Sequence, residues 1–289
     1  MTPIKRINET DVTRVKSLIN LLDDEDNSIY FIARDHLISM GELALPLLEI
    51  HLQTNDPVLQ DRVKEAYEVI TSAILKEQIR SYRQKYREEM NLEEGVLLIA
   101  KYGYPQIDMR TFSDLLNFFA SELQGRLDFA DPPEEIAVKI GKYFSEEKGF
   151  SGSEIDYYDG DYHYINKVIE TKRGVPISLS VIYLLVLKRL NLPVKGIGMP
   201  GHFIIRYEFG AKQILADPSH AGKILSLEEC KNYLIRMGYT FSSEYLDPVS
   251  NKQILERMIR NLILVFEKQD RPSKVQTFLQ CIDILNMNL

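Results

Sequence analysis

The sequence predicts an α+β protein that is predominantly helical, with a small antiparallel sheet flanked by helical N- and C-terminal regions. Three observations support this fold class. The first 90 or so residues carry helical patterns and no strand pattern. Runs rich in β-branched and aromatic residues are confined to the stretch 194–217. Beyond residue 226 the apolar spacing is helical again.

The N-terminal region is expected to be entirely helical. Its apolar spacing predicts helices at residues 11–22, 27–40, 42–53 and from Pro57 towards Met90. Asn27 is the expected cap of the second helix, and Gly41 can end that helix in the left-handed conformation. Residues 26–29 resemble residues 56–59, and this period of about 30 residues suggests a HEAT-like repeat. A plain helical bundle explains the same pattern equally well.

The central and C-terminal regions combine further helices with the expected strands. The helices are predicted at 92–101, 111–127, 131–144, 176–190, 226–239, 250–268 and 272–287. The strands are predicted at 194–199, 202–208 and 213–217. Asp131 is the expected cap of its helix, and the helix at 176–190 is apolar nearly all round, which indicates burial on most sides. We therefore expect three regions, at residues 1–90, 91–240 and 241–289.

The composition excludes several classes of protein. Hydrophobic residues make up 45% of the chain and charged residues 27%, which is enough for a globular core. A net charge of −7 without a basic stripe argues against nucleic acid and anionic membranes as main partners. Cys230 and Cys281 lack metal-site spacing and fit a reducing compartment. No apolar signal segment follows Met1, so we expect a cytoplasmic protein.

The stretch from Gly201 to Pro218 carries the most informative pattern. Two β-type runs flank Phe209 and Gly210, and a glycine there can supply the positive φ that a tight turn needs. If those two residues form the loop, Arg206 faces Gln213 and His202 faces Asp217 across the hairpin. Any loop with an even number of residues keeps His202 and Asp217 on one face.

A carboxylate beside an imidazole fixes the imidazole tautomer and stabilises the imidazolium. That arrangement is the orienting half of a nucleophile–base–acid triad. His202 and Asp217 are therefore candidate catalytic residues. By pattern alone they also fit a purely structural role at a strand start and a strand end. His220 follows in the next loop and could reach the same site.

Longer motifs connect this hairpin with a known family. The segments Asn166–Ser180, Leu192–Val194 and Gly196–Phe203 closely resemble the SirB1 family of the transglutaminase-like superfamily. Residues 92–100 resemble it too, and the helices around residues 258–262 are similar to its TPR-like tail. The resemblance covers roughly residues 90–289 and implies a papain-type, transglutaminase-like core.

The resemblance also implies which residues form the site. In the superfamily a buried helix begins with a catalytic cysteine in a Gly-x-Cys pattern, and later strands supply a histidine and an aspartate. His202 matches the histidine and Asp217 the aspartate. Gly174-Val175-Pro176 occupies the Gly-x-Cys position, so proline stands where the thiol is expected. Ser178 is a candidate substitute nucleophile. Its position is rotated by about 200° from residue 176 on a helix, and such serines more often cap or pack.

Two functional hypotheses follow. The first is a pseudoenzyme whose cleft binds a protein or peptide segment in a regulatory role. The alternative is an acyl-transfer or amide-hydrolysing enzyme with His202 as base, Asp217 as its orienting partner, and Ser178 or water as nucleophile. Neither hypothesis requires a cofactor, and the sequence predicts no metal site. The acidic loop at residues 156–163 has some oxygen ligands but matches no calcium-loop spacing.

Overall fold

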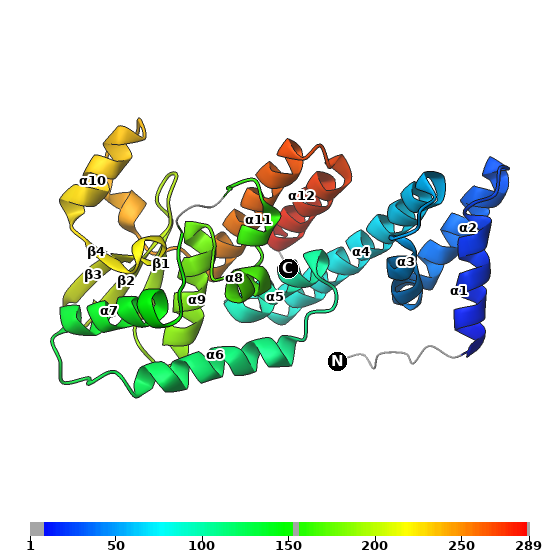
Figure 1. The fold of residues 1–289 in the computed structure, drawn as a ribbon. Coiled ribbons are helices and arrows are strands. Elements are labelled where there is room, and N and C mark those ends of the chain that lie inside the picture. The colour runs from blue at the N-terminus through cyan, green and yellow to red at the C-terminus, as the bar shows by residue number, and fades with distance from the viewer. Residues whose placement is uncertain (1–8, 153–155, 288–289) are drawn as a thin grey trace. The chain divides into compact units, whose positions relative to one another are not determined.

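The computed structural model describes residues 9–152 and 156–287 of the chain. The chain divides into two compact units, Met1–Ser81 and Tyr82–Leu289. The predicted fold class is confirmed, because helices dominate the described residues and the sheet is small and antiparallel (Figure 1). The predicted division into residues 1–90, 91–240 and 241–289 stays a prediction. No helix in the described ranges combines the length and apolar character needed to cross a bilayer.

The first unit is helical, as the sequence predicts. Its helices are α1 (Glu9–Leu21), α2 (Asn27–Met40), α3 (Leu45–His51) and the start of α4 (Pro57–Lys85). Their apolar faces meet in a core that includes Val15, Leu37, Leu48 and Val63. The predicted cap of α2 is wrong by one residue, because the Asp26 carboxylate accepts the hydrogen bond from the Ser28 amide. The expected helix at 42–53 is shortened because a 3₁₀ turn at Gly41–Leu43 precedes α3.

The second unit contains the remaining helices. They are α5 (Leu92–Gly103), α6 (Met109–Gln124), α7 (Pro133–Lys142), α8 (Ile165–Thr171), α9 (Pro176–Arg189), α10 (Leu227–Arg236), α11 (Asn251–Lys268) and α12 (Pro272–Asn286). Asp131 does not cap α7 as predicted. Pro132 holds the cap position, and the Asp131 carboxylate pairs with Lys139 at 2.5 Å instead.

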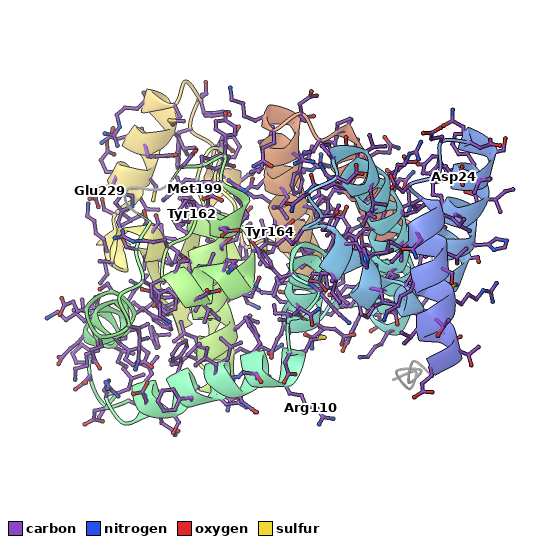
Figure 2. The ribbon with its side chains drawn as sticks, turned by 45° about the vertical axis from the view of Figure 1, so that its right-hand side comes forward. Asp24, Arg110, Tyr162, Tyr164, Met199 and Glu229 are labelled. Atoms are coloured by element: carbon purple, nitrogen blue, oxygen red, sulfur yellow. The ribbon has the colours of Figure 1, made fainter. Side chains whose placement is uncertain are left out.

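Helix α9 is the centre of the second unit. Every residue from Ile177 to Leu187 is buried, which confirms the burial that its all-round apolar pattern predicts. It packs against the sheet on one side and against α6 on another (Figure 1). The segment before α8 runs beside the start of α9 (Figure 2), where the Val175 amide donates to the Tyr162 carbonyl at 3.0 Å. These contacts fix where α9 begins.

The sheet has four antiparallel strands in the order β1-β2-β3-β4. The strands are β1 (Val194–Ile197), β2 (Ile204–Phe209), β3 (Lys212–Asp217) and β4 (Lys223–Leu225). The sequence analysis missed β4, which is only three residues long and has no alternating pattern. Helix α7 covers β3 and β4, while α9 lies on β1 and β2.

The predicted register of the β2–β3 hairpin is wrong by two residues. Phe209 pairs with Lys212, so the loop residues are Gly210 and Ala211, and Arg206 lies opposite Leu215. Gly210 has a φ of 62°, as expected for a glycine in a tight turn. A shift by two residues leaves every side chain on its predicted face, because side chains alternate with a period of two.

Candidate functional site

The sequence analysis expected His202 to open a strand. In the structure His202 instead lies in a short turn before β2. The strand begins at Ile204, and Gly201 has a φ of 71° that turns the chain just before His202. Two hydrogen bonds from Arg257 on α11 hold this turn. One guanidinium nitrogen donates to the Met199 carbonyl at 2.9 Å and the other to the His202 carbonyl at 2.8 Å. The backbone of His202 is therefore anchored from the C-terminal helices.

Asp217 ends β3 and faces His202 directly. His202 Nε2 lies 2.7 Å from Asp217 Oδ2. The side chains are 11% and 6% exposed, so the pair is shielded from water. The predicted contact between these two residues is thus present, although it forms between a turn and a strand end. Such a bond holds one tautomer of the imidazole and lets the carboxylate stabilise its charged form.

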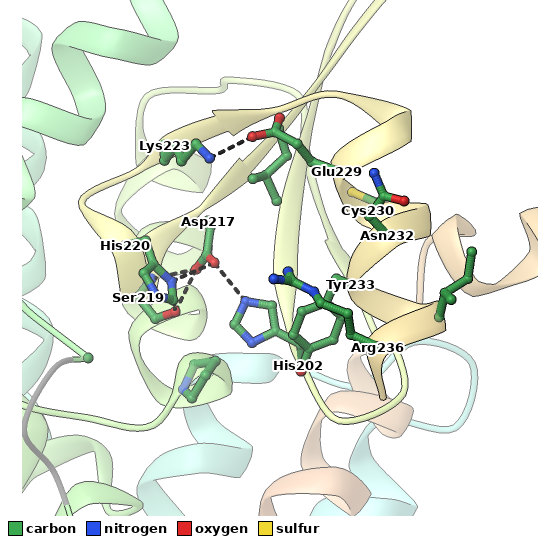
Figure 3. Close-up of a pocket in the computed structure, with 14 residues that line it drawn as sticks. His202, Asp217, Ser219, His220, Lys223, Glu229, Cys230, Asn232, Tyr233 and Arg236 are labelled. Atoms are coloured by element: carbon green, nitrogen blue, oxygen red, sulfur yellow. Dashed lines mark hydrogen bonds and ion pairs between the residues drawn. The ribbon is translucent and has the colours of Figure 1, made fainter. Parts of the chain in front are cut away.

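A second imidazole binds the same carboxylate oxygen. His220 Nδ1 lies 2.8 Å from Asp217 Oδ2, and Figure 3 shows the two histidines approaching Asp217 from different sides. The other oxygen, Oδ1, accepts hydrogen bonds from the Ser219 amide at 2.9 Å and the Ser219 hydroxyl at 2.6 Å. The sequence analysis missed Ser219. Aspartate followed by proline is a turn signal that places the amide two residues on within reach of the carboxylate.

These contacts lower the pKa of Asp217. Burial by itself raises the pKa of Asp217, but the hydrogen bonds from His202 and Ser219 and the positive charge that His202 and His220 can carry outweigh it. The resulting pKa is about 2. Asp217 is therefore a carboxylate throughout the physiological range, buried and held by four hydrogen bonds.

The His202–Asp217 pair opens into a pocket of about 860 Å³ (Figure 3). Helix α10 forms one wall with Cys230, Tyr233, Ile235 and Arg236. The Tyr233 ring packs against the His202 ring at a centroid distance of 5.2 Å. Glu229 and Asn232 of the same helix also line the pocket, and the rest of the lining comes from other segments: Gly152, Pro176, Ser219, His220, Lys223 and Leu225.

On the α9 side, the residue that lines the pocket is Pro176, which has no hydroxyl group. Pro176 lines the pocket at the first turn of α9. Ser178 is fully buried and lies outside the lining, and its hydroxyl donates to the His163 carbonyl at 3.1 Å. Ser180 is also fully buried, with its hydroxyl 3.4 Å from the Phe203 carbonyl. The fold thus brings Pro176, His202 and Asp217 to one pocket and directs the Ser178 hydroxyl elsewhere.

Cys230, which the sequence analysis did not assign to the site, lines the pocket. Its side chain is buried in a small cluster with Leu215 and Leu234. Burial, followed by the negative charges of Glu229 and Asp217, raises the pKa of Cys230 to about 11. A thiol with that pKa is almost entirely protonated near neutral pH, so it is a poor nucleophile.

Comparisons with known proteins identify the family of the chain. A family model described as the transglutaminase-like superfamily matches residues 110–260. A UPF0162 protein of Xylella fastidiosa (strain Temecula1 / ATCC 700964) is 30% identical over 190 residues, which cover 64% of this chain and 68% of that protein. F-box only protein 21 of Mus musculus is 30% identical over 158 residues, which cover 52% of this chain and 25% of that protein.

A UPF0162 protein of Vibrio cholerae serotype O1 is 26% identical over 199 residues, which cover 68% of this chain and 72% of that protein. No solved structure matches the chain. The family match spans the helices and strands that build the pocket, including the segments that carry Pro176, His202 and Asp217. On these grounds the chain belongs to the transglutaminase-like superfamily.

Proposed function

We propose that the pocket binds a protein or peptide segment, and that the chain is a SirB1-like pseudoenzyme without thiol chemistry. One observation carries this proposal. Pro176, at the position where the resemblance implies a catalytic cysteine, lines the same pocket as His202 and Asp217. A proline ring has no group that can attack a carbonyl. The cysteine that does line the pocket, Cys230, has a pKa of about 11 and is not activated.

The lining of the pocket suits a peptide. Its volume of about 860 Å³ is in the range of pockets that enclose several side chains. Ile235 is 52% exposed and offers an apolar contact, while Tyr233 presents an aromatic face beside His202. Arg236 and the buried Asp217–histidine group supply the polar contacts that orient a ligand. Aromatic and arginine side chains in a partly enclosed site are typical anchors of protein recognition.

The helical regions outside the core are the proposed contacts for further partners. A HEAT-like region at residues 1–90 and a TPR-like region at 241–289 would each present helix faces of the kind that bind protein segments. The first unit exposes large apolar side chains on α2, among them Phe31 at 48% and Ile32 at 60%. These features support a role in protein assembly rather than in small-molecule chemistry.

An acyl-transferring or amide-hydrolysing enzyme is the second candidate. The 2.7 Å hydrogen bond between His202 and Asp217 favours it, because this pair would serve as general base and orienting partner. Its nucleophile would be Ser178 or a water molecule. Ser178 gives this candidate little support, since its hydroxyl is committed to the His163 carbonyl and lies outside the pocket lining. Peptide binding is therefore the better supported function.

Selection of peptides on the full chain tests the proposal. Random dodecapeptides displayed on phage are selected against the purified protein, and the affinity of the synthetic peptides is measured by fluorescence polarisation. We expect Ile235→Glu, inside the pocket, to weaken binding at least about 10-fold by placing a charge in an apolar contact. Leu264→Glu is the matched control, because Leu264 is 48% exposed on α11 and outside the pocket lining. Equal binding to both variants would contradict the proposal.

A further inference from the structure

The two histidines and the aspartate form a compact group of metal-ligand atoms. His202 and His220 each direct one ring nitrogen at the same oxygen of Asp217, at 2.7 Å and 2.8 Å. All three donor atoms lie within 4.8 Å of one another. In the part of the chain that the structure describes, no other group of three such side chains comes together in this way. We propose that these three residues bind a divalent transition-metal ion, with Zn²⁺ as the best match.

The distances between the donor atoms fit one ion. Donors that bind zinc at about 2.1 Å lie roughly 3.0–3.4 Å from each other around the ion. The two nitrogen–oxygen distances of 2.7 Å and 2.8 Å need to lengthen by only about half an ångström to reach this range. The donor atoms all lie within 4.8 Å of one another, so the two imidazole nitrogens have to turn towards the ion as it binds.

The surroundings of the group also suit a metal ion. The Ser219 amide and hydroxyl bind Asp217 Oδ1 and so direct Oδ2 towards the histidines, as the partners of metal-binding carboxylates do. His220 is 72% exposed, which gives an ion a path from solvent. The nearby cation Lys223 is paired with Glu229 at 2.6 Å, so its charge is largely offset. The buried carboxylate of Asp217 is the negative charge that faces the ion.

The donor set selects the class of metal. Two imidazole nitrogens and one carboxylate oxygen suit Zn²⁺ and its first-row neighbours. Mg²⁺ and Ca²⁺ prefer sites made of oxygen ligands alone. When the ion binds, each of the two imidazole nitrogens gives up its hydrogen bond to Asp217, and each neutral ring carries its proton on the other nitrogen. Three protein ligands leave at least one coordination position for water or for an oxygen atom of a bound ligand.

The sequence analysis predicted no metal site, and the reason lies in the spacing of the ligands. Asp217 and His220 are three residues apart, but His202 is fifteen residues upstream on the other side of a hairpin. The sequence motif therefore resembles no common zinc spacing. Only the turn after β3, which folds His220 back onto Asp217, completes the group.

Calorimetric titration of the metal-free full-length protein with ZnCl₂ tests the proposal. We expect one zinc ion to bind per chain, and MgCl₂ under the same conditions to give no binding. His220→Ala removes one of the three ligands and is expected to weaken zinc binding at least about 100-fold. Because His220 is exposed, this variant should keep the wild-type circular dichroism spectrum, which shows that it folds. His36→Ala is the matched control, since His36 is an exposed histidine of α2.

A second readout comes from cobalt. Co²⁺ in a site with nitrogen and oxygen ligands gives visible absorption bands, which we expect in the wild type and the His36→Ala variant but not in His220→Ala. Zinc affinity that is unchanged in His220→Ala, or the absence of zinc binding to the wild type, would overturn the proposal. Peptide affinity is measured separately in the presence of a chelator. A failure of the metal site is therefore distinguishable from a failure of the proposed peptide site.

Discussion

Two sides of the same pocket differ sharply in chemistry. The end of β3 is crowded with polar groups, where Asp217 accepts four hydrogen bonds from His202, Ser219 and His220. The start of α9 presents Pro176, and the serine hydroxyl of its first turn points to another part of the core. The β3 side carries groups that can hold and transfer protons. The α9 side offers only the ring of Pro176.

The difference shows that an imidazole–carboxylate group and a helix start are built by separate parts of the fold. The imidazole–carboxylate group needs only a turn, a strand end and the anchoring hydrogen bonds from Arg257. The family resemblance implies a thiol at the start of a buried helix, and at that position this chain has Pro176. In the proposed pseudoenzyme the hydrogen-bonded group is present without a thiol, and we propose that it contributes to binding a peptide or a metal ion.

The largest expected effect comes from placing a thiol on the helix side. We expect the Pro176→Cys thiol to react with iodoacetamide at least about 300-fold faster than Cys230 near neutral pH, because an unperturbed thiol has a pKa roughly 2.5 units below the value of about 11 for Cys230. The helix N-terminus and His202 would lower the pKa of the new thiol further. Peptide mapping by mass spectrometry measures alkylation at each cysteine separately.

The control for this variant removes the imidazole. In the Pro176→Cys protein, the further change His202→Ala should slow alkylation of residue 176, because the thiol loses an imidazole of the same pocket that can accept its proton. If both proteins react at the same rate, then His202 does not act on position 176. The comparison between the two sides of the pocket would then fail as a description of a degenerate catalytic site.

A smaller effect is expected on the strand side, in the free energy of unfolding. Asp217→Ala leaves His202 and the Ser219 amide without their acceptor in a buried site. We expect a loss of about 3 kcal/mol, which is typical of breaking a buried charged group. Urea unfolding measures it, with Asp283→Ala on the exposed face of α12 as control. A loss below about 0.5 kcal/mol, as for an ordinary surface change, would show that the group is not structural.

The same variant has a characteristic pH dependence. The pKa of Asp217 falls from its ordinary value of 3.8 to about 2 in the folded protein. The stabilisation is therefore complete above pH 3.8 and is lost as the pH falls through about 2. We expect the difference between the wild type and Asp217→Ala to shrink by about 2 kcal/mol over this window. A difference that stays constant would contradict the lowered pKa.

Much of this fold follows from local sequence patterns. The buried helix α9, the flanking helices and three of the four strands each carry a periodicity that identifies them. The errors lie where tertiary contacts decide. The loop between β2 and β3 consists of Gly210 and Ala211 rather than Phe209 and Gly210. Pro132 rather than Asp131 holds the cap position of α7, and Asp131 pairs with Lys139.

The site was only partly predictable for a related reason. His202 and Asp217 lie on one face in both the predicted and the observed register, because the two registers differ by two residues. The sequence analysis named His220 as a residue that could reach the site, and it does so through the turn after β3. Cys230 reaches the pocket through the packing of α10, which a helical pattern alone does not reveal. Ser178 appeared as a candidate because of its place near a helix start, yet the rotation of the helix turns its hydroxyl towards His163.

Covalent labelling of the wild-type protein tests the central claim most directly. The protein is incubated with a fluorophosphonate, which reacts with activated serines, and the intact mass is then measured beside that of Ser178→Ala. We expect no adduct on either protein, because the Ser178 hydroxyl donates to the His163 carbonyl and the hydroxyl of Ser219, the serine in the pocket lining, donates to Asp217. A stoichiometric adduct on the wild type that disappears in Ser178→Ala would show a working serine nucleophile and contradict the account.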